Sequence, residues 1–83
     1  RYVADFYYKR EMYDSAAGRY EKITARFPNT EAEQYAYARW AQSLINQNKS
    51  DEATHVYRVY LKRYPSGDYS KQASRWLERS EGK

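Results

Sequence analysis

The stretch Tyr13–Pro28, YDSAAGRYEKITARFP, decides the fold because Ser50–Pro65, SDEATHVYRVYLKRYP, repeats its pattern. The two stretches align at a constant offset of 37 residues. The matched pairs are Asp14/Asp51, Ala16/Ala53, Tyr20/Tyr57, Arg26/Arg63, Phe27/Tyr64 and Pro28/Pro65. An internal period of this length is typical of a solenoid built from stacked helical repeats.

Each of the two stretches has the pattern of one amphipathic helix. The apolar residues of the second recur at helical spacing: Ala53, Val56, Tyr57, Tyr60, Leu61 and Tyr64. Those of the first are Ala16, Tyr20, Ile23 and Phe27. Ser50 is expected to cap the second helix. Pro28 and Pro65 end the helices, because the residue before a proline is pushed out of the α region.

The remaining sequence extends this pattern in both directions. A helix is expected over residues 1–10, followed by a short turn and therefore by an antiparallel partner. Thr30 and Glu33 have the spacing of a capping box at the start of a long helix that ends near Gln47. A last helix follows residues 66–68. The sequence thus predicts an all-α solenoid of five helices and about two and a half repeats, divided as 1–28, 29–65 and 66–83.

Composition argues against an enzyme. The protein of 83 residues has no cysteine and one histidine, His55, which lies off the apolar stripe and reads as a surface residue. Asp51 and Glu52 begin a helix, and a favourable interaction with the helix dipole explains them better than a role in acid–base chemistry. No glycine-rich phosphate loop occurs among the three glycines. We therefore expect no catalytic site, cofactor, metal or small-molecule substrate.

A net charge of +4 leaves two kinds of partner open. Arg58, Lys62 and Arg63, with tyrosines nearby, could contact phosphates and bases of a nucleic acid. Acidic residues are interspersed with them, so a protein partner is favoured. No stretch is apolar and long enough to cross a bilayer.

The pattern resembles the tetratricopeptide repeat. The family's small residues at the helix crossing, its aromatic and its proline match these positions: Ala4 and Ala16, Ala41 and Ala53, Tyr20 and Tyr57, Pro28 and Pro65. The usual period is about 34 residues, so the period here is three residues longer. Glu11 and Asn48 stand where the family has a turn glycine. The places of its tail-carboxylate clamp hold Asp5, Arg39, Gln72 and Trp76, so no binding of that kind is expected.

The resemblance implies that the first helix of each pair lines a concave, partner-binding side. The residues mapped to it are Arg1, Asp5, Tyr8, Lys9, Tyr35, Ala38, Gln42, Asn46, Gln72, Arg75 and Arg79. Polar groups with aromatic anchors suit a groove for a peptide segment. The alternative is that many of these residues are merely exposed.

A narrower similarity is to the C-terminal repeats of the BamD family of outer-membrane assembly lipoproteins. The residues that carry it are ADFYYKR at 4–10, Tyr13, AAGRY at 16–20 and FPNT at 27–30, with Gly18 in place of the family's asparagine. This similarity implies a lipid-tethered scaffold on the periplasmic face of the bacterial outer membrane that docks a POTRA-type domain. A weaker similarity is to periplasmic adaptors of the cell-division coordinator type.

Arg19 is the partner contact that the BamD resemblance implies. It lies at the edge of the apolar stripe, and its counterpart in the second stretch is Val56. A guanidinium in this place suits bidentate pairing with a carboxylate of the partner. The alternative is a side chain that only covers the aromatic stripe.

Overall fold

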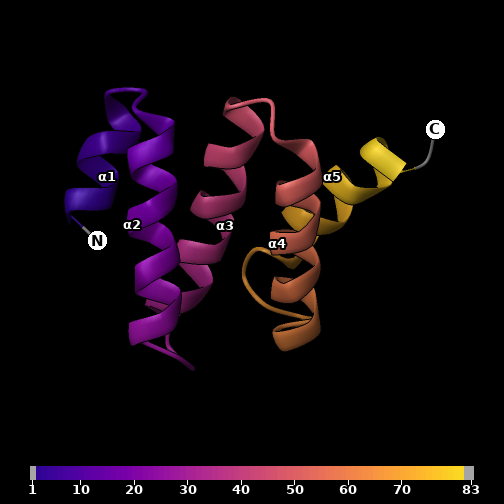
Figure 1. Cartoon of the computed structure of the whole chain (residues 1–83). Helices are drawn as coiled ribbons and strands as arrows, with labels where there is room; N and C mark the ends of the chain where they lie inside the picture. Colours follow the sequence, from indigo (N-terminus) through magenta and orange to yellow (C-terminus); the bar gives the residue numbers. More distant parts are fainter. Residues whose placement is uncertain (1, 82–83) are drawn as a thin grey trace.

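The computed structural model describes residues 2–81, and five α-helices follow one another within this range (Figure 1). They are α1 (Tyr2–Lys9), α2 (Tyr13–Arg26), α3 (Glu31–Asn46), α4 (Ser50–Arg63) and α5 (Ser70–Glu81). No strand occurs between residues 2 and 81. The predicted all-α solenoid is therefore confirmed. Arg1, mapped above to the concave side, lies outside the described residues.

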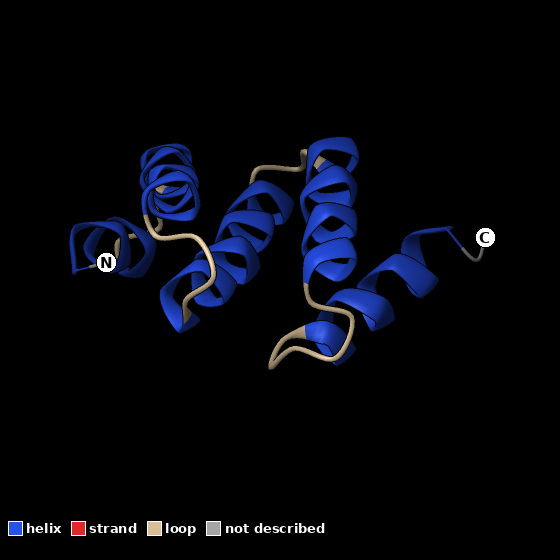
Figure 2. Ribbon diagram, turned by 90° about the horizontal axis from the view of Figure 1, so that it is seen from below, coloured by secondary structure: helices blue, strands red, loops and turns tan. Residues whose placement is uncertain are grey.

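The helices alternate between two layers. Figure 2 shows α2 and α4 along one side of the molecule, and α1, α3 and α5 along the other. The pairs α1/α2 and α3/α4 form hairpins, and α5 packs against α4. The assembly is flat, with extents of 34 × 28 × 16 Å. Each layer therefore buries its apolar face mainly on its neighbour, as expected for a repeat stack.

Small residues let the paired helices approach closely. Ala4 and Ala16 lie between α1 and α2, and both are fully or almost fully buried. Ala41 and Ala53 have no exposed surface in the second repeat. The prediction that small residues lie where the helices cross is confirmed.

The turns within the two hairpins have the same backbone geometry. Glu11 has φ of 61° and Asn48 has φ of 62°, both in the left-handed region. The amide of Met12 donates to the carbonyl of Tyr7 at 2.9 Å, and Lys49 donates to Leu44 at 2.9 Å. These are Schellman-type helix ends, at which glycine is the usual residue. The repeat therefore demands a left-handed residue here, and the sequence supplies glutamate and asparagine.

The predicted helix starts are correct in one case and wrong in another. Thr30 caps α3, because its side chain accepts a hydrogen bond from the Glu33 amide at 3.1 Å. Ser50 is not the cap of α4; it is the first helical residue, and Lys49 precedes it without a capping side chain. The carbonyl of Lys49 already accepts the first helical bond, from Ala53 at 3.0 Å, and this moves the helix start by one residue.

Candidate partner-binding groove

A groove lies on the side of the molecule formed by α1, α3 and α5. It encloses about 450 Å³. Its lining residues are Tyr8, Tyr35, Ala38, Arg39, Gln42, Tyr69 and Gln72. They come from α1, from α3, from Tyr69 in the turn before α5, and from α5 itself. Structural repetition thus brings residues far apart in the sequence to one hollow, and most of them belong to the predicted concave surface.

Two tyrosine hydroxyls, one of them from the groove residue Tyr35, hold the carboxylate of Asp5. Tyr20 donates to Oδ1 of Asp5, and Tyr35 donates to the same oxygen at 2.7 Å. Burial and the bond to Asp5 raise the pKa of both phenols, so both remain protonated donors. Asp5 is half-buried and ties α1 to α2 and α3. Its predicted contact with a partner stays a prediction.

Arg39 is stacked on two aromatic rings of the groove. Its Cζ lies 4.2 Å from the ring centroid of Tyr8 and 5.3 Å from that of Tyr35. These distances are those of cation–π contacts. Burial raises the pKa of Tyr8, and the nearby guanidinium opposes that shift. No carboxylate between residues 2 and 81 forms an ion pair with Arg39.

In the sequence, Arg39 was considered only as one of the four positions at which the residues of the tail-carboxylate clamp are missing. A usable signal was present, because Arg39 follows Tyr35 by four residues and so shares its face of the helix. The second ring, that of Tyr8, comes from another helix, and only the fold places it beside the guanidinium.

The other predicted residues of the concave side lie around the groove rather than in its lining. Lys9, Asn46, Arg75 and Arg79 are exposed. Asn46 accepts a long hydrogen bond of 3.4 Å from Gln42. These four residues are accessible to a partner, and their contact with one stays a prediction.

Arg19 lies at a different surface, beside a hollow that residues of α1 and α2 line. It is exposed, and its Cζ is 5.8 Å from the ring of Tyr7. It borders a hollow of about 210 Å³, whose other lining residues are Val3, Ala4, Lys22, Ile23, Arg26 and Phe27. Its counterpart Val56 is 3% exposed in the core of the second repeat. Arg19 and the groove therefore form two separate candidate contacts.

An ion pair between the buried Glu33 and the exposed Arg63, which sequence reasoning missed, joins the start of α3 to the end of α4. Glu33 is 1% exposed, and its Oε2 lies 2.8 Å from Nε of Arg63. The amide of Asn29 donates to Oε1 at 2.7 Å, and the Tyr64 hydroxyl also donates to it. Burial alone would raise the pKa of Glu33, but these hydrogen bonds and Arg63 lower it.

The capping-box prediction that the Glu33 side chain bonds the Thr30 amide is therefore wrong. Its carboxylate accepts from the amide of Asn29 rather than from that of Thr30. Glu33 is 1% exposed, and its bonds to Asn29, Arg63 and Tyr64 join the start of α3 to the end of α4.

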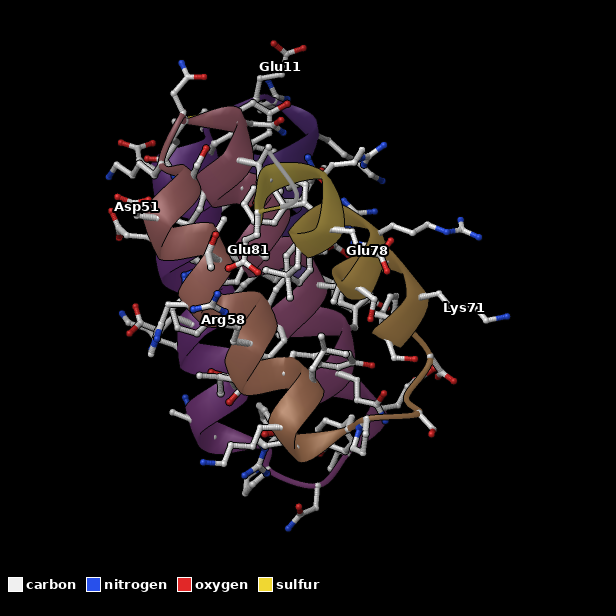
Figure 3. All side chains as sticks on the ribbon, turned by 90° about the vertical axis from the view of Figure 1, so that its right-hand side faces the viewer. Glu11, Asp51, Arg58, Lys71, Glu78 and Glu81 are labelled. Atoms are coloured by element: carbon white, nitrogen blue, oxygen red, sulfur yellow. The ribbon has the colours of Figure 1, made fainter. Side chains whose placement is uncertain are left out.

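The basic residues considered for nucleic-acid binding are largely paired. Arg58 forms an ion pair with Glu81, and the two side chains point toward each other in Figure 3. Arg63 is held by Glu33. A phosphate backbone would have to compete with these carboxylates, which disfavours the nucleic-acid interpretation.

The described residues contain no group of acidic, histidine and cysteine side chains that could hold a metal. His55 is exposed and borders a hollow on the side of α2 and α4, beside Trp40 and Val59. Within residues 2–81 no helix has the length and apolar character needed to cross a membrane.

Comparison with known families gives one match. The model of the tetratricopeptide repeat matches residues 2–30 and again residues 35–67. No curated protein and no solved structure matches the sequence. The two matched segments cover the α1/α2 hairpin and the α3/α4 hairpin.

Proposed function

Because the chain belongs to the tetratricopeptide repeat family, we propose that it is a docking module whose groove binds an extended segment of a partner protein. Repeats of this family are non-catalytic and generally bind proteins. The observation that carries the proposal is the shared hollow of about 450 Å³, to which three successive first helices contribute.

The chemistry of the groove suits a peptide backbone. The amides of Gln42 and Gln72 offer both donors and acceptors, which match the carbonyl and N–H groups of a peptide backbone. Tyr8, Tyr35 and Tyr69 offer broad aromatic surface with few rotatable bonds. Such surfaces bind extended segments at a modest cost in side-chain entropy.

Peptide display tests this proposal directly. A library of random segments, displayed between constant flanks, is selected against the full protein, and the affinity of enriched peptides is then measured. Gln42→Ala should weaken binding by roughly fivefold to tenfold, the value of about one lost hydrogen bond. Glu52→Ala, an exposed change at the start of α4, is the matched control and should leave affinity unchanged. A selection that enriches no peptide would contradict the proposal.

We also propose a narrower function, a BamD-like scaffold on the periplasmic face of the outer membrane that docks a POTRA-type domain. The supporting observation is Arg19, an exposed guanidinium beside the apolar residues Val3, Ile23 and Phe27. A charged pair surrounded by apolar contacts is a common anchor of protein interfaces. In this proposal a lipid anchor outside these residues supplies the attachment to the membrane.

Calorimetry with a purified POTRA-type domain tests the narrower function. Arg19→Ala should keep the fold and lower affinity by about 2–5 kcal/mol if the pair is buried in the complex. Arg10→Ala is the control, since Arg10 is also exposed and stacked, 4.6 Å from the Phe6 ring. Equal affinity of the Arg19 variant would leave Arg19 as a packing residue. Absence of any binding would favour an adaptor of the cell-division coordinator type.

A further inference from the structure

The lining of the groove carries charge of one sign. Arg39 is the charged member of the lining, and its other members are tyrosine, glutamine and alanine. Asp5, the acidic residue of the predicted concave surface, does not line the groove and accepts hydrogen bonds from Tyr20 and Tyr35. A bound segment therefore meets a positive charge with no carboxylate in the lining to balance it.

The position of the guanidinium is fixed in advance. Its Cζ lies over the rings of Tyr8 and Tyr35, and these cation–π contacts limit the orientations of a long side chain. Among residues 2–81 no carboxylate pairs with the guanidinium, so its N–H groups are available to an acceptor. A planar fork of N–H donors matches the two oxygens of a carboxylate. Arg39 is thus preorganised for an anion of that shape.

The surroundings of Arg39 favour a carboxylate within a segment over one at the end of a polypeptide. Terminal and side-chain carboxylates carry the same single charge, but a terminal carboxylate would end the segment at Arg39 and leave part of the groove lining without a backbone to bind. The side chain of a glutamate or aspartate lets the segment continue past Arg39 in both directions. It also leaves the backbone of the segment on both sides free to bond the amides of Gln42 and Gln72.

We infer that the groove selects segments with a glutamate or aspartate side chain, which Arg39 binds through its guanidinium. This inference rests on the proposed docking function, because it assumes that a protein segment occupies the groove. It adds the chemical identity of one position in that segment.

The experiment compares selections on four versions of the full protein. Random segments are displayed between constant flanks, so that no free C-terminal carboxylate lies near the variable residues. The baits are the unchanged protein, Arg39→Gln, Arg39→Lys and the control Lys62→Gln, which removes an exposed cation of α4, in the other layer of helices and outside the groove lining. Thermal melting verifies that each variant is folded before selection.

The unchanged protein and Lys62→Gln should enrich an acidic residue at one fixed position of the segments. Arg39→Gln should select segments without that preference, and Arg39→Lys should keep it in weaker form because charge remains and the fork is lost. For one enriched peptide, changing its Glu to Gln should weaken binding to the unchanged protein roughly tenfold or more. The same change should have little effect on binding to Arg39→Gln.

Two results would overturn the inference while leaving the docking function intact. One is enrichment of segments with no acidic position, and the other is an acidic preference that Arg39→Gln retains. Selection of segments only when a free C-terminus is allowed would assign the carboxylate to the end of a polypeptide and would also overturn it. A protein that enriches no segment contradicts the docking function itself, and the inference with it.

Discussion

Tyr20 and Tyr57 hold the same place in successive repeats, and their hydroxyl groups have different partners. Both residues are buried, with 0% and 1% exposure. The hydroxyl of Tyr20 donates to the carboxylate of Asp5. That of Tyr57 accepts from the side-chain amide of Gln72 at 2.9 Å. The ring is what the repeat requires, and the partner of the hydroxyl is free to change.

The same contrast extends to the neighbours of the two rings. At the 37-residue offset, Gln42 occupies the repeat position of Asp5, and Gln72 occupies that of Tyr35. The first repeat therefore joins its helices through a carboxylate that two phenols share, and the second does so through neutral amides. Hydrogen bonds to a charged group are stronger than those between neutral groups. We therefore expect packing to stabilise the two repeats equally. Hydrogen bonds should stabilise the first repeat more than the second.

The largest expected effect tests the shared part of this comparison. Tyr20→Ala and Tyr57→Ala should each lower the free energy of unfolding by about 3–5 kcal/mol, since each removes a buried aromatic ring and leaves a cavity. Urea unfolding followed by circular dichroism measures both losses. A loss below about 1 kcal/mol in one variant alone would mean that the two rings are not equivalent in packing.

The next effect separates Arg63 from its counterpart Arg26. Arg63 pairs with buried Glu33, while no carboxylate of residues 2–81 pairs with Arg26. Glu33→Gln should cost about 2–3 kcal/mol, because it removes the ion pair and weakens the charged hydrogen bonds. In the same measurement, Arg63→Gln should lower the free energy of unfolding. The matched change Arg26→Gln should leave it unchanged. Equal losses in these two variants would contradict the assignment of the pair.

Glu33 also sets a pH dependence that can be measured. The fold lowers the pKa of Glu33 below its ordinary value of 4.5, so the unfolded protein binds the proton more tightly. The stabilisation is therefore fully present above about pH 4.5 and is lost as the pH falls through the pKa of the folded state. The difference in stability between the unchanged protein and Glu33→Gln should shrink over this acidic range. A difference that stays constant from about pH 7 to about pH 3 would contradict it.

These contrasts also mark the limit of sequence reasoning. The repeated pattern predicts the helices, the buried alanines and the rings of Tyr20 and Tyr57, because these depend on periodicity within single helices. It does not predict that Glu33 meets Arg63 and Tyr64, about 30 residues away, since a local capping box already accounts for a glutamate there. The stacking of Arg39 was missed for the same reason, because one of its rings lies on another helix.

A smaller effect tests the unequal part of the comparison. Tyr20→Phe should cost about 1.5 kcal/mol, because it removes a hydrogen bond to a carboxylate in a half-buried place. Tyr57→Phe should cost about 0.5–1 kcal/mol, since Gln72 is exposed and its amide can bond water instead. The unfolding free energies of the two variants give the comparison. Equal losses would show that the charge of Asp5 adds nothing to the first repeat.

The smallest effect concerns the two turns, where the same backbone carries different residues. Glu11, at the edge of the molecule in Figure 3, and Asn48 both have a left-handed backbone. A residue with a Cβ is disfavoured there by about 1–2 kcal/mol, and asparagine tolerates it better than glutamate. Glycine removes that penalty but gains about 0.5–1 kcal/mol of entropy in the unfolded state. Glu11→Gly should therefore stabilise the fold by about 0.5–1 kcal/mol, and Asn48→Gly should change stability by about zero. Thermal melting of both variants measures these changes. If Glu11→Gly is less stable than the unchanged protein, the side chain of Glu11 makes a contact that stabilises the fold by more than the backbone strain destabilises it.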